Sequence, residues 1–111
     1  MRGKIESSHV EDVNGNPAGG STTGIGFSIL WQNGPLVDPA TGERHEQSGA
    51  FVEDVIEAVV DRIMYYQRAS ERKFACRENA LAITKLEEAL HWLNARTADR
   101  ERRGVEGTHE A

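Results

Sequence analysis

The chain has 111 residues and a formal net charge of -5, which predicts one domain (residues 1–111) with a modest core. No apolar run approaches the roughly 20 residues that cross a bilayer, so we expect a soluble cytoplasmic protein with no membrane partner. The acidic balance repels nucleic acid over most of the surface, which argues against DNA or RNA as partners and leaves small anions that are met locally.

Residues 1–36 carry strand and turn signals. Residues 4–13 (KIESSHVEDV) alternate irregularly, and residues 22–32 (TTGIGFSILWQ) alternate more regularly. Between them, residues 14–20 (NGNPAGG) suit a chain reversal. The pattern predicts an antiparallel β-hairpin or small sheet, with four apolar side chains on one face: Ile25, Phe27, Ile29 and Trp31.

The next segment, residues 37–49, is predicted to be a loop because Asp-Pro and Thr-Gly steps favour turns. It is longer than most connections, so we expect it to be mobile or functional. Ser48 is the expected N-cap of a first helix over residues 50–68, whose apolar side chains recur at i, i+3 and i+4.

After a polar break, a second helix is predicted over residues 74–103, about 45 Å long at 1.5 Å per residue. The two helices form an antiparallel hairpin, and residues 104–111 are a tail. The expected fold class is therefore α+β. The long helix exceeds what this small domain covers, which favours a second copy of the chain. Cys76, the one cysteine, is expected to be a small buried or half-buried side chain outside any disulfide.

Positive charge gathers near the end of the second helix. Residues 94–103 hold four arginines against two acids, in a chain that is acidic overall. One interpretation is structural, because cations suit a helix C-terminus and pair with acids on the first helix. The other is a phosphate clamp, since guanidinium groups bind phosphate with two hydrogen bonds. Nearby aromatics would then stack on a base, which makes the ligand a nucleotide; they are Trp31, Tyr65, Tyr66 and Phe74.

Other chemical signals are weaker. Glu88 and His91 have the Glu-x-x-His spacing of di-iron bundles, but a second motif is absent and a surface histidine is the simpler interpretation. Gly24 and Gly26 lack the third glycine of a dinucleotide fingerprint. No nucleophile with a histidine and an acid can be proposed from the sequence. We therefore predict a protein that is not an enzyme, with no catalytic residue, metal or cofactor.

Three segments together resemble a known family: residues 26–36 (GFSILWQNGPL), 49–63 (GAFVEDVIEAVVDRI) and 74–110 (FACRENALAITKLEEALHWLNARTADRERRGVEGTHE). The family comprises phage helical-hairpin proteins and includes Thoeris anti-defence and anti-CBASS proteins. The resemblance implies sequestration of cyclic nucleotide immune signals without cleavage, which blocks anti-phage defence in the host bacterial cytoplasm. The implied ligands are glycocyclic ADP-ribose and cyclic di- or trinucleotides. The implied assembly is a homo-oligomer, a dimer or a hexamer, with pockets between subunits.

The resulting nucleotide-binding candidates combine stacking, amide and cationic side chains: Trp31, Tyr66, Phe74, Arg77, Asn79, Arg96, Arg100, Arg103, Thr108 and His109. Three structural alternatives stay open. Trp31 could belong to the core, and Asn79 could bond to the strand region. Thr108 and His109 could be part of a frayed tail. Two other functions also stay open, an oligomeric structural phage protein without a small ligand and a messenger-degrading enzyme.

Overall fold

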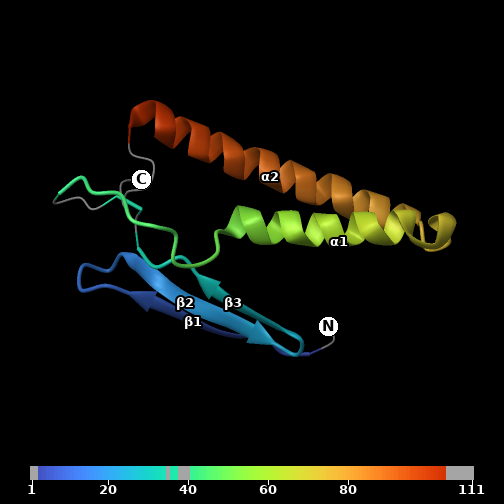
Figure 1. Ribbon diagram of the computed structural model, residues 1–111, viewed down its shortest axis with the longest axis horizontal. Coiled ribbons are helices and arrows are strands. Elements are labelled where there is room, and N and C mark those ends of the chain that lie inside the picture. The colour runs from blue at the N-terminus through green and yellow to red at the C-terminus, as the bar shows by residue number, and fades with distance from the viewer. Residues whose placement is uncertain (1–2, 35, 38–40, 105–111) are drawn as a thin grey trace. The chain divides into compact units, whose positions relative to one another are not determined.

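The computed structural model describes residues 3–34, 36–37 and 41–104 (Figure 1). Three strands precede two helices, which confirms the predicted α+β fold. The chain divides into a β unit that includes residues up to Phe51 and a helical unit, Val52–Arg102. The elements are β1 (Glu6–Glu11), β2 (Pro17–Gly24), β3 (Phe27–Trp31), α1 (Val52–Arg72) and α2 (Arg77–Arg103).

The β unit is a three-stranded antiparallel sheet in the order β1-β2-β3. Ser7 pairs with Thr22, and Thr22 pairs with Ile29, so these residues share one face. The single strand expected over residues 22–32 is wrong, because the chain turns between Gly24 and Phe27. Ile25 stands at this turn with 93% of its surface exposed, away from the face predicted for it. Gly26 permits the turn because it adopts a φ of +87°.

The segment after β3 returns to the sheet at Ala50. The N–H of Ala50 donates to the carbonyl of Leu30 at 2.7 Å, and the carbonyl of Ala50 accepts from the N–H of Gln32 at 3.1 Å. Ser48 accepts a hydrogen bond from the N–H of Asn33 at 3.2 Å, so its hydroxyl serves the loop. The expectation that Ser48 caps the first helix is therefore wrong, and α1 begins at Val52.

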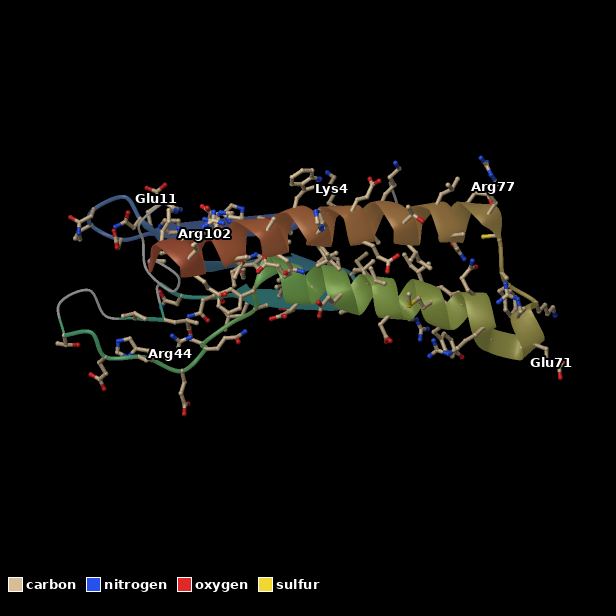
Figure 2. The ribbon with its side chains drawn as sticks, turned by 90° about the horizontal axis from the view of Figure 1, so that it is seen from above. Lys4, Glu11, Arg44, Glu71, Arg77 and Arg102 are labelled. Atoms are coloured by element: carbon tan, nitrogen blue, oxygen red, sulfur yellow. The ribbon has the colours of Figure 1, made fainter. Side chains whose placement is uncertain are left out.

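The helical unit is an antiparallel hairpin, with α1 and α2 side by side in both views (Figures 1 and 2). The less exposed apolar positions recur at helical spacing on each helix. They are Ile56, Val60 and Ile63 on α1, and Ile83, Leu86, Leu90 and Leu93 on α2. Among the described residues, Val60 is the one hydrophobic residue that is buried, at 8% exposure. A single copy of the chain therefore leaves much of its apolar surface open to solvent.

The turn between the helices includes the last residues assigned to α1, and it contains neither glycine nor proline. Ser70, Glu71 and Arg72 adopt φ values of 51°, 55° and 71°, in the left-handed region. This conformation costs about 1–2 kcal/mol for each L-residue. The second helix then begins at Arg77, later than the predicted residue 74, because Cys76 caps it. The Cys76 sulfur accepts from the N–H of Asn79 at 3.4 Å, and the thiol is exposed, contrary to expectation.

Candidate functional site

The predicted binding residues that the structure describes belong to three different parts of the chain. Trp31 belongs to the β unit, four others lie near the turn of the helical hairpin, and three lie near the end of α2. The turn group is Tyr66, Phe74, Arg77 and Asn79, and the α2-end group is Arg96, Arg100 and Arg103. Thr108 and His109 lie outside the described residues. Figure 2 labels Arg77 and Arg102 at opposite ends of α2.

The separation along α2 is large. Arg96 follows Asn79 by seventeen positions along the helix, which corresponds to about 25 Å between their Cα atoms. This exceeds the reach of two side chains toward one small ligand. Within one copy of the helical unit, the turn group and the α2-end group therefore do not form a single pocket.

Trp31 is tied into the sheet through its indole nitrogen. The indole N–H donates to the hydroxyl of Thr22 at 2.8 Å, and this hydroxyl lies 3.0 Å from that of Ser7. The three side chains thus link three neighbouring strands on one face. Because the N–H has a partner and the residue is half-buried, Trp31 serves the packing of the β unit. What it offers to a ligand is the exposed part of its ring.

The turn end of α1 carries an aromatic and cationic cluster that the sequence analysis named only in part. The guanidinium carbon of Arg62 lies 5.0 Å from the ring centre of Tyr65 and 4.9 Å from that of Tyr66. Arg68 lies 5.7 Å from the ring centre of Tyr65. These distances fit cation–π contacts. The i, i+3 and i+4 spacing of arginine and tyrosine was a signal for this cluster, and Arg62 and Arg68 were missed.

Arg62 is held in this cluster by a directional bond. Its Nε–H donates to the hydroxyl of Tyr66 at 3.2 Å. This hydrogen bond and the charge interaction with Tyr66 raise the pKa of Arg62 above its ordinary value, at which a guanidinium is already cationic. The two tyrosines are 43% and 41% exposed. The cluster therefore presents fixed positive charge and accessible aromatic rings together.

The first turn of α2 is held by a side-chain clasp. Gln67 donates from Nε2 to the carbonyl of Cys76 at 3.1 Å and accepts from the Cys76 N–H at 3.0 Å. Asn79 is half-buried in this turn, where its own N–H donates to the Cys76 sulfur. Phe74 is 55% exposed, with the Lys73 ammonium 5.5 Å from its ring centre. Phe74 and Arg77 are both accessible to a ligand.

The arginines at the end of α2 differ in their surroundings. Arg102 forms an ion pair with Asp99 on the same helix, three residues earlier. Arg100 is 5% exposed and, like Arg103, is engaged with other groups. A buried guanidinium requires such partners, because desolvation without them is costly. Arg96 is exposed, and the part of the chain that the structure describes contains no ion pair for it. The cluster thus combines the buried Arg100 with exposed arginines, of which Arg102 is paired with Asp99.

The described residues contain no group of three or more histidine, cysteine or acidic side chains arranged for a metal ion. Glu88 lies 3.6 Å from the ammonium of Lys85, and His91 packs edge-on against Trp92 with 5.4 Å between ring centres. Both residues therefore make ordinary contacts on the surface of α2. Neither helix, as far as it is described, has an apolar stretch of the length that crosses a membrane.

Comparison with known proteins gives two matches. The family model described as the Acb2/Tad1 hairpin domain matches residues 26–98. The chain is also 52% identical, over 83 residues, to the Thoeris anti-defense 1 protein of Bacillus phage SBSphiJ7. That match covers 75% of this chain and 52% of the relative, so the chain spans about half the length of the curated relative. The matched model includes the turn group and Arg96, and it ends before Arg100 and Arg103.

Proposed function

Because this chain belongs to the Acb2/Tad1 hairpin-domain family, we propose that it is a phage anti-defence protein that binds and sequesters a cyclic nucleotide messenger. The messenger is glycocyclic ADP-ribose or a cyclic di- or trinucleotide, and it is held without being cleaved. By removing it from the host bacterial cytoplasm, the protein blocks an antiviral response. Stoichiometric capture needs no catalytic group, so the proposed protein is not an enzyme.

The observation that carries this proposal is the accessible arginine and aromatic side chains on the helical unit. A cyclic nucleotide offers phosphate oxygens and a purine ring, which guanidinium groups and aromatic rings bind. Near the turn, Tyr66, Phe74 and Arg77 are exposed, and Arg62 is fixed beside Tyr66. The Gln67 clasp holds the backbone at the start of α2 in place before binding, which lowers the cost of ordering this segment around a ligand.

A homo-oligomer completes the site in this proposal. Two hairpins packed antiparallel would place the turn of one copy beside the α2 end of the other, which joins the two groups that one copy keeps apart. The open apolar surface supports such packing. Trp92 is 72% exposed, Phe74 55% and Leu81 44%, although each is a large hydrophobic side chain on the helical unit. The assembly is a dimer or a higher oligomer such as a hexamer.

Calorimetric titration with glycocyclic ADP-ribose and a panel of cyclic di- and trinucleotides tests the proposal, with the mass measured on the same sample. We expect tight binding at a simple ratio of ligand to chain. Heating the complex should then release the ligand intact. Conversion of the ligand on repeated turnover would instead establish a messenger-degrading enzyme.

A second candidate is an oligomeric structural phage protein that binds no small ligand. The pairing of Arg102 with Asp99 and the burial of Arg100 favour it, because they assign part of the arginine cluster to structure. No heat of binding across the whole ligand panel, from a sample that is folded and oligomeric, would support this candidate and contradict sequestration.

A further inference from the structure

The turn of the helical hairpin combines a strained backbone with a sequence that is compatible with a helix. Residues from Ala50 to Arg103 include no glycine and no proline. Ser70, Glu71 and Arg72 nevertheless adopt positive φ values in succession, after Ala69 leaves the helix with a ψ of 148°. Left-handed conformations are unfavourable for L-residues, and runs of them are rare. The turn therefore persists because its surroundings hold it.

Four hydrogen bonds hold the turn closed. Two join the Gln67 side chain to the backbone of Cys76, at 3.0 and 3.1 Å. Two are internal to the turn, from the N–H of Lys73 to the carbonyl of Ser70 and from the N–H of Ala75 to that of Arg72, both at 3.1 Å. All four groups lie at or near the surface, where water competes as a partner. A helical conformation of these residues is therefore close in free energy to the observed turn.

In that alternative, Ala69–Arg72 adopt right-handed helical values, residues 73–76 also become helical, and α1 continues into α2. Ala69, Glu71, Arg72 and Lys73 are good or moderate helix formers, so the residues do not oppose the change. The result is one helix over residues 52–103, about 78 Å long. It separates the apolar stripe of α1 from that of α2 and exposes both, so an isolated open chain is disfavoured.

We propose that Ser70–Arg72 form a hinge through which two copies of this chain exchange α2. In the exchanged pair, the α2 of each copy lies beside the α1 of the other, as the two helices lie side by side within one closed hairpin. The apolar stripes are covered as before, and the three left-handed residues are relieved. A second copy is the occupant because the stripe of α1 is complementary to α2 of this same sequence. The proposal does not depend on the proposed ligand.

Two opposed triple substitutions test the hinge. The glycine variant accepts positive φ without strain and favours the closed hairpin; it combines Ser70→Gly, Glu71→Gly and Arg72→Gly. The alanine variant favours the continuous helix; it combines Ser70→Ala, Glu71→Ala and Arg72→Ala. Each variant carries spin labels at Glu57→Cys and Glu88→Cys, which are exposed, with Cys76→Ser to remove the native thiol. Labelled chains are unfolded with an excess of unlabelled chain and refolded together, so the measured distance lies within one chain.

A closed hairpin gives a short distance between the labels, because the two helices lie side by side. An exchanged chain gives about 45 Å, since 31 residues then separate the labels along one helix. We expect the alanine variant to show a larger ratio of long to short distances than the glycine variant, by about tenfold or more. The long distance should coincide with at least two chains per particle. Equal ratios, or a long distance in single chains, would overturn the proposal.

A further variant guards against loss of folding in the triple substitutions. Gln67→Ala removes the clasp without changing the strained residues, and it should raise the proportion of the long distance. Asp61→Ala changes another exposed residue of α1 and leaves the clasp intact, so it should match the parent protein. A Gln67→Ala protein that keeps its helical content and gives the short distance alone would contradict the hinge.

Discussion

Gln32 shows how one side chain organises the loop that follows the sheet. Its Oε1 accepts hydrogen bonds from the N–H groups of Ser48 and Gly49, at 2.8 and 3.1 Å. These partners lie sixteen and seventeen residues later in the chain. The side chain therefore fixes the far end of the loop beside the end of β3 and supports the bridge between Trp31 and Ala50. Sequence reasoning did not single out Gln32, because its partners are distant in sequence.

Gln32→Ala should lower the free energy of unfolding of the β unit by about 1–2 kcal/mol, since two backbone N–H groups lose their partner. Urea denaturation followed by near-ultraviolet spectroscopy measures the change. Gln47→Ala is the control, because exposed Gln47 makes one hydrogen bond, to the carbonyl of Gly49. An equal loss in both variants would contradict the role assigned to Gln32.

Arg96→Ala should weaken binding of the messenger by about tenfold or more, because a hydrogen bond to a charged phosphate is worth about 1.5–3 kcal/mol. Thermal stability should stay nearly unchanged, since Arg96 is exposed. Titration calorimetry measures the affinity. Arg102→Ala is the matched control on the same helix, where the side chain is paired with Asp99. Equal affinities for the two variants would remove Arg96 from the proposed site.

Among the elements, the middle strand β2 requires a glycine because its neighbours pack closely against it. Gly20 lies opposite His9 on β1 and Trp31 on β3. It has a φ of +129°, and a Cβ added there would lie 2.0 Å from the backbone carbonyl oxygen of Ser8. Backbone atoms yield less readily than the end of a flexible side chain. The close approach of β1 and β2 therefore requires glycine at this position.

Gly20→Ala should destabilise the sheet by about 3 kcal/mol or more, because it adds a clash to an unfavourable φ. Gly26→Ala should cost about 1 kcal/mol, since its φ is positive but the space around it is open. Urea denaturation of both variants compares the two effects on one chain. A larger loss for Gly26→Ala than for Gly20→Ala would show that the β1 and β2 pairing is looser than described.

At the scale of the whole molecule, the outstanding feature is how little apolar surface the described chain buries. Two large side chains illustrate this: Trp92 on α2 is 72% exposed, and Leu30 on β3 is 64% exposed. Burial of apolar surface is the main source of stability, so a chain of this kind gains stability when copies associate. In the function proposed above, the same association supplies the second half of the ligand site.

Trp92→Ala should shift the protein toward smaller particles at micromolar concentration, because removing a large aromatic from an interface typically costs about 2 kcal/mol or more. Light scattering after chromatography measures the mass. Lys85→Ala is the control on the same helix. The Lys85 side chain makes a surface ion pair with Glu88, and its removal should leave the mass unchanged. An unchanged mass for Trp92→Ala would place the interface elsewhere on the chain.

Four features could be predicted from the amino-acid sequence alone: the α+β class, the helical hairpin, the polar break between the helices and the place of the arginines along the chain. These features depend on local periodicity and turn chemistry, which neighbouring residues express without distant partners. Short stretches of sequence also carry the resemblance to the family, and the match of residues 26–98 to the Acb2/Tad1 hairpin domain confirms it.

Tertiary structure decided the features that depend on distant pairing. The turn at Gly24–Phe27 follows from the register of β3 on β2, and the late start of α2 follows from Cys76 as its cap. Ser48 serves the loop because Asn33 lies beside it in space. The binding candidates were grouped in one set by residue type, but the rigid length of α2 holds Asn79 and Arg96 apart. Residue type indicates what a side chain can bind, whereas distance in the folded chain decides which side chains act together.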